Sequence, residues 1–134
     1  CPFAAHIRKT RPRADLGLPE EEPLHRPLMR AGIPYGPEVT EEESASNETS
    51  VERGLAFVAY QSNIQTQFRF IQMTWADNLS FRVPGVGVDP IIGRVTRSVE
   101  NTPRTIGGLD PNNSSLPTIL DTDFVVSRGG EYFF

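Results

Sequence analysis

A histidine at position 6 and the arginines near it are the residues of this chain best suited to bind a ligand. His6 follows the apolar residues 2–5 and precedes Ile7, so we expect its imidazole to face an apolar site with cations along one edge. A neutral imidazole in such a site can ligate haem iron, and arginines can hold the carboxylates of a porphyrin. The alternative is that His6 is buried and bonded to a backbone carbonyl, and this is the more common role of a histidine that has no second histidine near it. His25 lies in a proline-rich segment, so we expect no site with several histidine ligands.

The charges along the chain are separated by sign. The formal net charge is −4, with four fixed positive charges in residues 6–13 and acidic runs at 20–22 and 41–43. An acidic chain is a poor candidate for binding nucleic acid, because phosphate affinity depends on clustered cations in a favourable net field. The basic cluster therefore fits a small anion, although a solvated basic turn explains it equally well. Apolar runs such as 55–60 are too short to cross a bilayer, so we expect no membrane span.

The chain is expected to be irregular up to about residue 52. Its many Pro, Glu and Ser residues predict a loop-rich excursion over 11–52, with a short strand at 32–35 and an exposed loop over 38–50. Residues 53–134 are expected to supply a strand, a helix, a long loop and a terminal strand. The first of these is the apolar run 54–60, which has the length and composition of a strand.

A helix is predicted over residues 64–78, with Asn63 at the capping position. Its apolar residues recur at helical spacing: Ile64, Phe68, Ile71 and Trp75. A loop is predicted from 81 to 117, and a terminal strand at 122–127 precedes an aromatic tail. The pattern is that of an α+β fold.

The start of the chain and its polar segments bear on whether it belongs to a longer, secreted protein. The chain begins at Cys1 with no initiator Met and no leader, so we expect it to come from a longer chain whose other segments complete the core. Four N-glycosylation acceptor patterns occur, and they favour a secreted glycoprotein. They lie at 47–49, 78–80, 112–114 and 113–115.

Five blocks of the sequence resemble the dye-decolorizing peroxidases. Residues 1–13, Cys-Pro-Phe-Ala-Ala-His-Ile-Arg-Lys-Thr-Arg-Pro-Arg, closely resemble the haem-ligand motif of that family. Four further blocks resemble the family in the expected order, at 29–36, 53–58, 68–75 and 128–134. The likeness spans nearly the whole chain and is strongest to the fungal, secreted branch.

The resemblance implies a fold and an activity. It implies a dimeric ferredoxin-like α+β barrel, of which residues 1–134 are most of the C-terminal ferredoxin-like half and the haem-binding portion. The implied enzyme carries haem b and reduces hydrogen peroxide while it oxidises bulky dyes, phenolic and other aromatic donors. Its other expected partner is the missing N-terminal portion of the same protein.

The resemblance also assigns roles on the side of the haem that binds the axial ligand. His6 matches the proximal ligand of the iron, and Arg13 matches an arginine near a haem propionate. Asp89, within 89–93, is the candidate carboxylate that accepts the other imidazole N–H of His6. Such a carboxylate makes the imidazole a stronger electron donor.

On the opposite, distal side, Arg30 matches the arginine placed where peroxide binds. A guanidinium that stays protonated can stabilise the negative charge that develops when the O–O bond breaks. Leu55 and Phe57 match apolar residues that crowd this pocket. Ordinary strand core also explains them, and the two explanations are compatible.

Two aromatic residues are candidates for carrying electrons to donors too large to enter the pocket. Trp75 matches the tryptophan proposed for surface oxidation in fungal members, and Tyr35 is the second candidate. Trp75 also continues the apolar stripe of the predicted helix, and that pattern more often marks helix core.

One family motif is missing from the sequence. The family's proton shuttle is an aspartate in Gly-x-x-Asp-Gly, and the nearest string, at 107–111, ends in proline and falls in the wrong part of the order. We therefore expect the shuttle in the N-terminal portion, and little turnover by this chain alone. A haem or porphyrin carrier without catalysis is the rival function, and a structural fragment left by proteolysis is a third.

Overall fold

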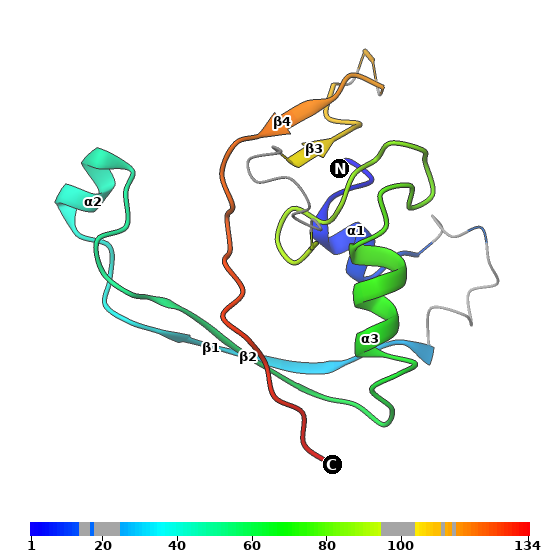
Figure 1. The fold of residues 1–134 in the computed structure, drawn as a ribbon, viewed down its shortest axis with the longest axis horizontal. Coiled ribbons are helices and arrows are strands. Elements are labelled where there is room, and N and C mark those ends of the chain that lie inside the picture. The colour runs from blue at the N-terminus through cyan, green and yellow to red at the C-terminus, as the bar shows by residue number, and fades with distance from the viewer. Residues whose placement is uncertain (14–16, 18–24, 95–103, 111, 114) are drawn as a thin grey trace. The chain divides into compact units, whose positions relative to one another are not determined.

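The computed structural model describes residues 1–13, 17, 25–94, 104–110, 112–113 and 115–134 (Figure 1). The chain divides into two compact units. One unit contains Cys1–Pro27 and Asn63–Phe134, and we call it the histidine unit. The other contains Leu28–Ser62, and we call it the hairpin unit. Within the predicted excursion over 11–52, residues 14–16 and 18–24 lie outside the described residues.

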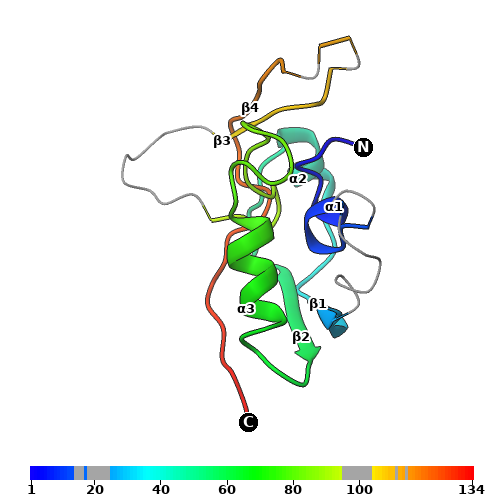
Figure 2. The same ribbon diagram turned by 90° about the vertical axis from the view of Figure 1, so that its right-hand side faces the viewer.

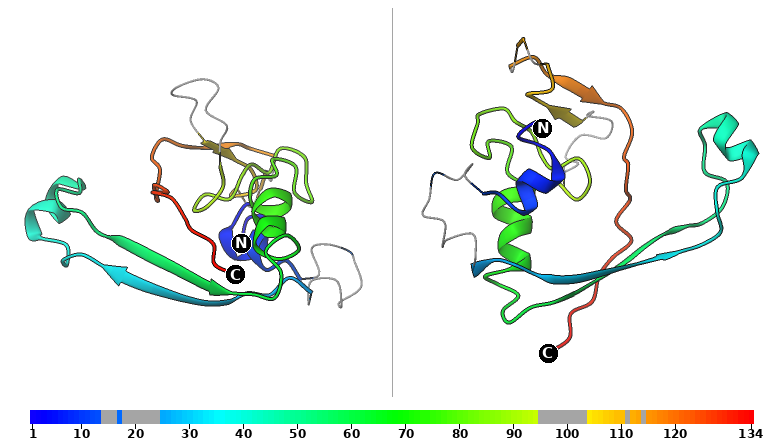
Figure 3. Two further views of the ribbon diagram at one scale, coloured as in Figure 1. Left: turned by 60° about the horizontal axis from the view of Figure 1, so that its bottom comes forward. Right: turned by 180° about the vertical axis from the view of Figure 1, so that it is seen from behind.

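The hairpin unit is a long antiparallel β-ribbon with a short helix in its connection (Figures 1 and 3). Strand β1, Met29–Tyr35, pairs with β2, Gly54–Tyr60, so that Met29 lies opposite Tyr60 and Tyr35 opposite Gly54. The predicted strand at 54–60 is confirmed, and the one at 32–35 forms the second part of β1. Helix α2, Glu41–Ser46, corrects the prediction of a loop over 38–50.

A capping box starts α2. The Thr40 side chain accepts from the Glu43 backbone N–H at 3.2 Å, and the Glu43 carboxylate accepts from the Thr40 N–H at 3.1 Å. The sequence contains this signal as Thr-x-x-Glu followed by acidic residues in the first turn, where the helix dipole favours negative charge. The acidic run at 41–43 is therefore a helix start as well as a charged surface.

Glu43 also ties the helix to the start of β2. Its carboxylate accepts from Arg53 Nη2 at 2.7 Å and from the Ser50 N–H at 2.6 Å. The Arg53 guanidinium and the N–H groups of Thr40 and Ser50 hold the pKa of Glu43 well below its usual range. The Glu43 carboxylate thus joins the two ends of the connection between β1 and β2 through its hydrogen bonds.

In its described residues the histidine unit includes the short helical segments α1, α3 and η3 and the short strands β3 and β4. Helix α1, His6–Thr10, packs against the helix made of α3, Phe68–Phe70, and the π-helical segment η3, Ile71–Ala76 (Figure 2). Strand β3, Arg104–Ile106, pairs antiparallel with β4, Thr118–Leu120. Small antiparallel sheets beside separate helices confirm the α+β class.

The predicted helix over 64–78 is present as a shorter helix at 68–76. The Asn63 side chain accepts from the Thr66 N–H at 3.0 Å, as a capping residue does. The second part is wound as a π-helix, since the Asp77 N–H bonds to the Gln72 carbonyl five residues before it at 2.9 Å. The helical prediction is therefore right in place and wrong in winding.

Two predictions for the end of the chain are wrong. Strand β3 lies inside the predicted loop of 81–117, and residues 122–127 form no strand. In that segment Phe124, Val125 and Val126 are all exposed. An apolar run indicates strand propensity, but a strand also needs a hydrogen-bonding neighbour, which the described residues do not supply at 122–127.

In the described residues we find no helix long and apolar enough to cross a membrane.

Buried apolar residues of the histidine unit come from the turn before α1, from the helix η3, from the loop after it and from β3. They are Ala4, Ile71, Trp75, Ala76, Phe81, Val86, Val88 and Ile106. The loop over 77–94 is irregular and yet buried at its centre, because Val86, Val88 and Asp89 pack inward from it. This loop positions the side chain that meets His6.

Candidate functional site

His6 and Asp89 are joined by a hydrogen bond across 83 residues of sequence. His6 begins α1, and its Nδ1 lies 2.8 Å from Asp89 Oδ2. An ionised carboxylate can only accept, so Nδ1 carries the proton and donates. A neutral imidazole held in this way keeps the Nε2 lone pair for another bond. The predicted hydrogen bond between the two residues is present.

Asp89 is oriented by its own turn. The side chain is fully buried, and its Oδ1 accepts from the N–H groups of Ile91 at 2.8 Å and Ile92 at 3.0 Å. The turn closes with the Gly93 N–H on the Asp89 carbonyl at 2.9 Å. A Cβ at Gly93 would lie 2.4 Å from that carbonyl oxygen, so the turn requires glycine. Both carboxylate oxygens are thereby fixed before any ligand arrives.

The ionisation of Asp89 results from two opposing effects. Burial raises the pKa of a carboxyl, but the bonds from His6 and from the N–H groups of Ile92 and Ile91 outweigh it, so the pKa of Asp89 lies below its usual range. Asp89 is therefore a carboxylate at neutral pH. A carboxylate on Nδ1 fixes the tautomer and increases the basicity of Nε2.

His6 is more exposed than the sequence predicts. Its side chain is 45% exposed, and its neighbour Ile7 is 64% exposed. The described residues of the histidine unit therefore do not close the expected apolar site at His6 and Ile7. A half-exposed imidazole beside an exposed apolar residue is suited to a large apolar ligand.

The basic cluster at 6–13 does not act as a single patch. Lys9 is fully buried, and the Arg8 guanidinium stacks 3.9 Å from the centre of the Phe3 ring and donates to the Cys1 carbonyl. Arg11 and Arg13 are exposed beyond or at the end of α1. The expected row of cations along one edge of the histidine site is therefore reduced, and the role of Arg13 stays a prediction.

In the hairpin unit, three of the predicted site residues share one face. Arg30 lies opposite Ala59, Phe57 opposite Gly32, and Leu55 opposite Pro34. Side chains alternate along a strand and paired residues point the same way, so Arg30, Phe57 and Leu55 are on the same side of the ribbon. Leu55 covers Gly32, where a Cβ would lie 3.0 Å from Leu55 Cδ1.

Exposure bears on the strand-core explanation of these two apolar residues, and their role in a pocket stays a prediction. Leu55 is 60% exposed and Phe57 is 49% exposed, so neither forms strand core within this chain. A cation and two large apolar side chains on one open face form a surface suited to a ligand with both apolar and anionic parts. His6 and Arg30 belong to different units.

The two aromatic candidates lie in different surroundings. Tyr35 is 46% exposed on the face of the ribbon opposite Arg30, where its ring covers Gly54. Trp75 is only 5% exposed and meets the Phe70 ring edge-on, with ring centres 5.3 Å apart. In this chain Trp75 is helix core and is not at the surface, as the apolar stripe indicates. Its role in electron transfer stays a prediction.

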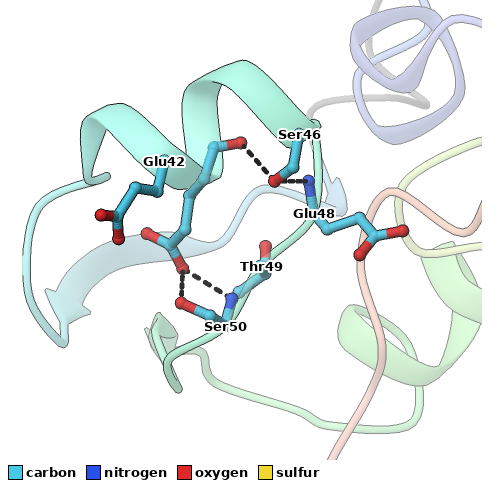
Figure 4. Close-up of a pocket in the computed structure, with 6 residues that line it drawn as sticks. Glu42, Ser46, Glu48, Thr49 and Ser50 are labelled. Atoms are coloured by element: carbon cyan, nitrogen blue, oxygen red, sulfur yellow. Dashed lines mark hydrogen bonds between the residues drawn. The ribbon is translucent and has the colours of Figure 1, made fainter.

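A shallow acidic pocket lies beside α2 (Figure 4). It is lined by Glu42, Glu43, Ser46, Glu48, Thr49 and Ser50. The Glu43 carboxylate in it already accepts bonds from Arg53 and Ser50, and the Glu48 N–H bonds to Ser46 Oγ at 3.3 Å. The groups of this pocket serve the fold, and among the described residues no cluster of metal-ligating side chains occurs.

The residue that sequence reasoning missed is Lys9. It stands three positions after His6 on α1, and its ammonium group bonds only to backbone carbonyls. Nothing local in the sequence marks it, because lysine is the residue type least expected to be fully buried. Its burial depends on the loop over 77–94, which folds over it.

Known proteins resemble this chain closely. It is 58% identical to dye-decolorizing peroxidase msp1 of Mycetinis scorodonius, over 100% of this chain and 28% of that relative's length. The crystal structure of a decolorizing peroxidase from Auricularia auricula-judae matches with a TM-score of 0.83 and 52% identity, over 97% of this chain and 30% of that one.

A second solved structure, of a dye-decolorizing peroxidase with an engineered heme pocket, matches with a TM-score of 0.82 and 52% identity, over 97% of this chain and 30% of that one. No protein-family model matches the chain. The chain thus spans less than a third of the length of these proteins.

Proposed function

This chain belongs to the dye-decolorizing peroxidase family, and from that premise we propose that it is the C-terminal, haem-binding part of a longer peroxidase. The intact enzyme reduces hydrogen peroxide and oxidises bulky dyes, phenolic and other aromatic donors. The remaining N-terminal portion carries the aspartate that shuttles protons. Three observations support the proposal: the identity of 58%, the chain's 28% share of that relative, and the geometry of His6.

The single observation that carries the proposal is the pair formed by His6 and Asp89. A proton fixed on Nδ1 by a buried carboxylate leaves Nε2 as a basic donor, which is the form of histidine that ligates haem iron. The residues present therefore fit haem, and when bound the haem supplies the iron at which peroxide is reduced. The sequence has no Cys-x-x-Cys-His motif, so we propose haem b, held without thioether bonds.

Arg30, Leu55 and Phe57 are the residues we assign to the peroxide side. Arg30 holds a permanent positive charge where negative charge develops on a departing oxygen. Leu55 and Phe57 lie on the same face and, once the rest of the enzyme covers them, would exclude water and so strengthen that electrostatic effect. Arg13 is assigned to a propionate, since a guanidinium can bind a carboxylate with two parallel hydrogen bonds.

The shared face of the ribbon favours the enzyme over a haem carrier. A carrier needs an axial histidine and apolar walls, but it has no need of a cation beside them on the peroxide side. The relatives reported above are named as peroxidases, which supports the same choice. We also propose that the protein is secreted and glycosylated, because Asn47 and Asn78 of two acceptor patterns are exposed. Two further patterns include position 114, which lies outside the described residues.

The test is the optical spectrum of the full-length protein recovered from culture medium, measured beside its His6→Ala variant. We expect a Soret band in the wild type and its loss in His6→Ala, because the iron loses its axial donor. The matched control is His25→Ala, which removes the other histidine, an exposed one, and should keep the band.

Three results would contradict parts of the proposal. A normal Soret band in His6→Ala would remove His6 as the ligand. A wild-type protein that holds haem but does not decolourise a bulky dye with peroxide would be a carrier. An intact mass that N-glycosidase leaves unchanged would exclude glycosylation.

A further inference from the structure

The ammonium group of Lys9 is surrounded by backbone oxygens. Nζ lies 2.6 Å from the Gly87 carbonyl, 2.7 Å from the Asn78 carbonyl and 3.4 Å from the Ala76 carbonyl. The side chain is fully buried and lies over the Phe81 ring, 5.6 Å from its centre. A lysine has three donors, and the geometry directs all of them to this loop.

These carbonyls lie at both ends of one loop. Ala76 ends η3, and its carbonyl also accepts from the Asp89 N–H at 2.8 Å. Gly87 stands two residues before Asp89, and its N–H bonds to the Leu79 carbonyl at 3.0 Å. Lys9 therefore connects the helix that carries His6 to the loop that carries Asp89.

Gly87 allows the loop to come this close. Its φ is +87°, a backbone conformation that favours glycine, and a Cβ there would lie 2.2 Å from the Thr105 carbonyl. The loop is thus held between Lys9 on one side and β3 on the other. Contacts on both sides therefore fix the backbone conformation at Gly87, two residues before Asp89.

Burying an ammonium group is unfavourable unless hydrogen bonds compensate for the lost water. Desolvation by burial lowers the pKa of Lys9 to about 8, although the carboxylates of Asp89 and Asp77 oppose this decrease. An apolar side chain of similar length would fill the same space at less cost in desolvation. The presence of lysine therefore indicates a need for its donors.

We propose that Lys9 is a positioning residue for the axial ligand: it fixes α1 to the loop over 76–89 so that Asp89 stays bonded to Nδ1 and Nε2 keeps one direction. This inference rests on the proposed function for its meaning, but the connection itself belongs to the protein without haem. It differs from a purely stabilising role because it acts on the bond between His6 and Asp89.

The experiment compares Lys9→Met with Arg82→Met in the full-length protein. Methionine keeps the length of the side chain and removes the donors and the charge. Arg82→Met is the matched control, because Arg82 is an exposed cation on the same loop and has no assigned role in binding. Both variants lose one positive charge.

The first readout is amide hydrogen exchange in the haem-free protein. We expect the N–H groups of Gly87 and Asp89 to exchange about tenfold faster or more in Lys9→Met, which corresponds to about 1.4 kcal/mol less protection. Arg82→Met should match the wild type. Unchanged exchange at both positions in a folded Lys9→Met protein would overturn the proposal.

The second readout is the iron–histidine stretching frequency of the reduced, haem-loaded protein, which reports how strongly Nδ1–H bonds to its carboxylate. We expect a lower frequency in Lys9→Met and no change in Arg82→Met. A wild-type frequency together with a lower melting temperature would show that Lys9 only stabilises the fold, and would overturn the positioning role.

Lys9→Arg provides the conservative variant, and it also serves if Lys9→Met does not fold. Arginine keeps a charged donor on α1, so we expect exchange and stretching frequency closer to the wild type than to Lys9→Met. A folded Lys9→Arg protein with fast exchange at Asp89 would count against the proposal. Because exchange is measured without haem, a wild type that binds no haem would refute the proposed function and leave this connection testable.

Discussion

At the scale of single residues, Asp89 shows how a buried carboxylate becomes a reliable acceptor. Burial alone would favour the protonated form, which would compete with His6 for the role of donor. The bonds from His6 and from two backbone N–H groups reverse this preference and keep the pKa low. A residue in this state holds an imidazole tautomer without help from solvent.

Trp75 combines two roles that one substitution can separate. Replacing it by alanine would leave a cavity beside Phe70 and Phe81 and cost about 3–5 kcal/mol of stability. Trp75→Phe keeps most of the packing but replaces the indole by a phenyl ring, which is harder to oxidise than an indole. If Trp75 carries electrons, we expect Trp75→Phe to oxidise bulky dyes several times more slowly and small donors at the wild-type rate.

Steady-state rates with one bulky and one small donor test this prediction, and Phe70→Leu serves as a control for altered packing beside Trp75. If Trp75→Phe lowers the rate by the same factor with both donors, relative to the wild type, Trp75 belongs to the core alone. The 5% exposure of its side chain makes that outcome a real alternative.

At the scale of elements, short helices in this chain depend on side-chain bonds at their ends. Helix α2 has six residues, too few to be stable through its backbone alone. Thr40 and Glu43 satisfy each other's backbone N–H groups, and Arg53 anchors the same carboxylate. The helix is therefore an outcome of its cap more than of its helix propensity.

Thr40→Ala tests this dependence on the cap. Loss of an N-cap side chain typically costs about 1 kcal/mol, so we expect the Glu43 and Ser44 amides to exchange about fivefold faster. Hydrogen exchange of the full-length protein measures the effect. Thr74→Ala, an exposed threonine that caps no helix, is the control and should change these amides little. Unaltered exchange in Thr40→Ala would mean that Arg53 and Ser50 suffice to hold α2.

At the scale of the whole molecule, the two units differ in how they bury apolar surface. The histidine unit has a core that includes Ile71, Trp75 and Phe81, whereas Leu55 and Phe57 on one face of the ribbon are exposed. Such an open apolar face is normally covered in the working protein. We therefore expect other segments of the longer protein to cover this face.

The same reasoning predicts that the 134-residue chain alone does not work as a peroxidase. It has no Gly-x-x-Asp-Gly motif to move the proton, so we expect no decolourisation of a dye by this chain with added haem and peroxide. The full-length protein under identical conditions is the positive control. Turnover by the chain at a rate near that of the full-length protein would show that Arg30 needs no aspartate.

Local patterns of the sequence were sufficient for several parts of this protein. The apolar run at 54–60 predicted β2, and the stripe that includes Ile71 and Trp75 predicted the helix, because period and propensity are local properties. The motif around His6 indicated the family. The sequence also contains the capping box that begins with Thr40, but the loop-like composition around it led to the prediction of a loop.

Tertiary structure decided what depends on distant partners. The resemblance predicted that Asp89 bonds to His6 across 83 residues, but the low pKa of Asp89 exists only because the turn at 89–93 and α1 come together. Lys9 is buried because a loop from far along the chain folds over it, against the usual preference of lysine for water. The segment 122–127 has the composition of a strand and lacks a neighbour in the described residues, because pairing is a property of two segments and cannot be read from one.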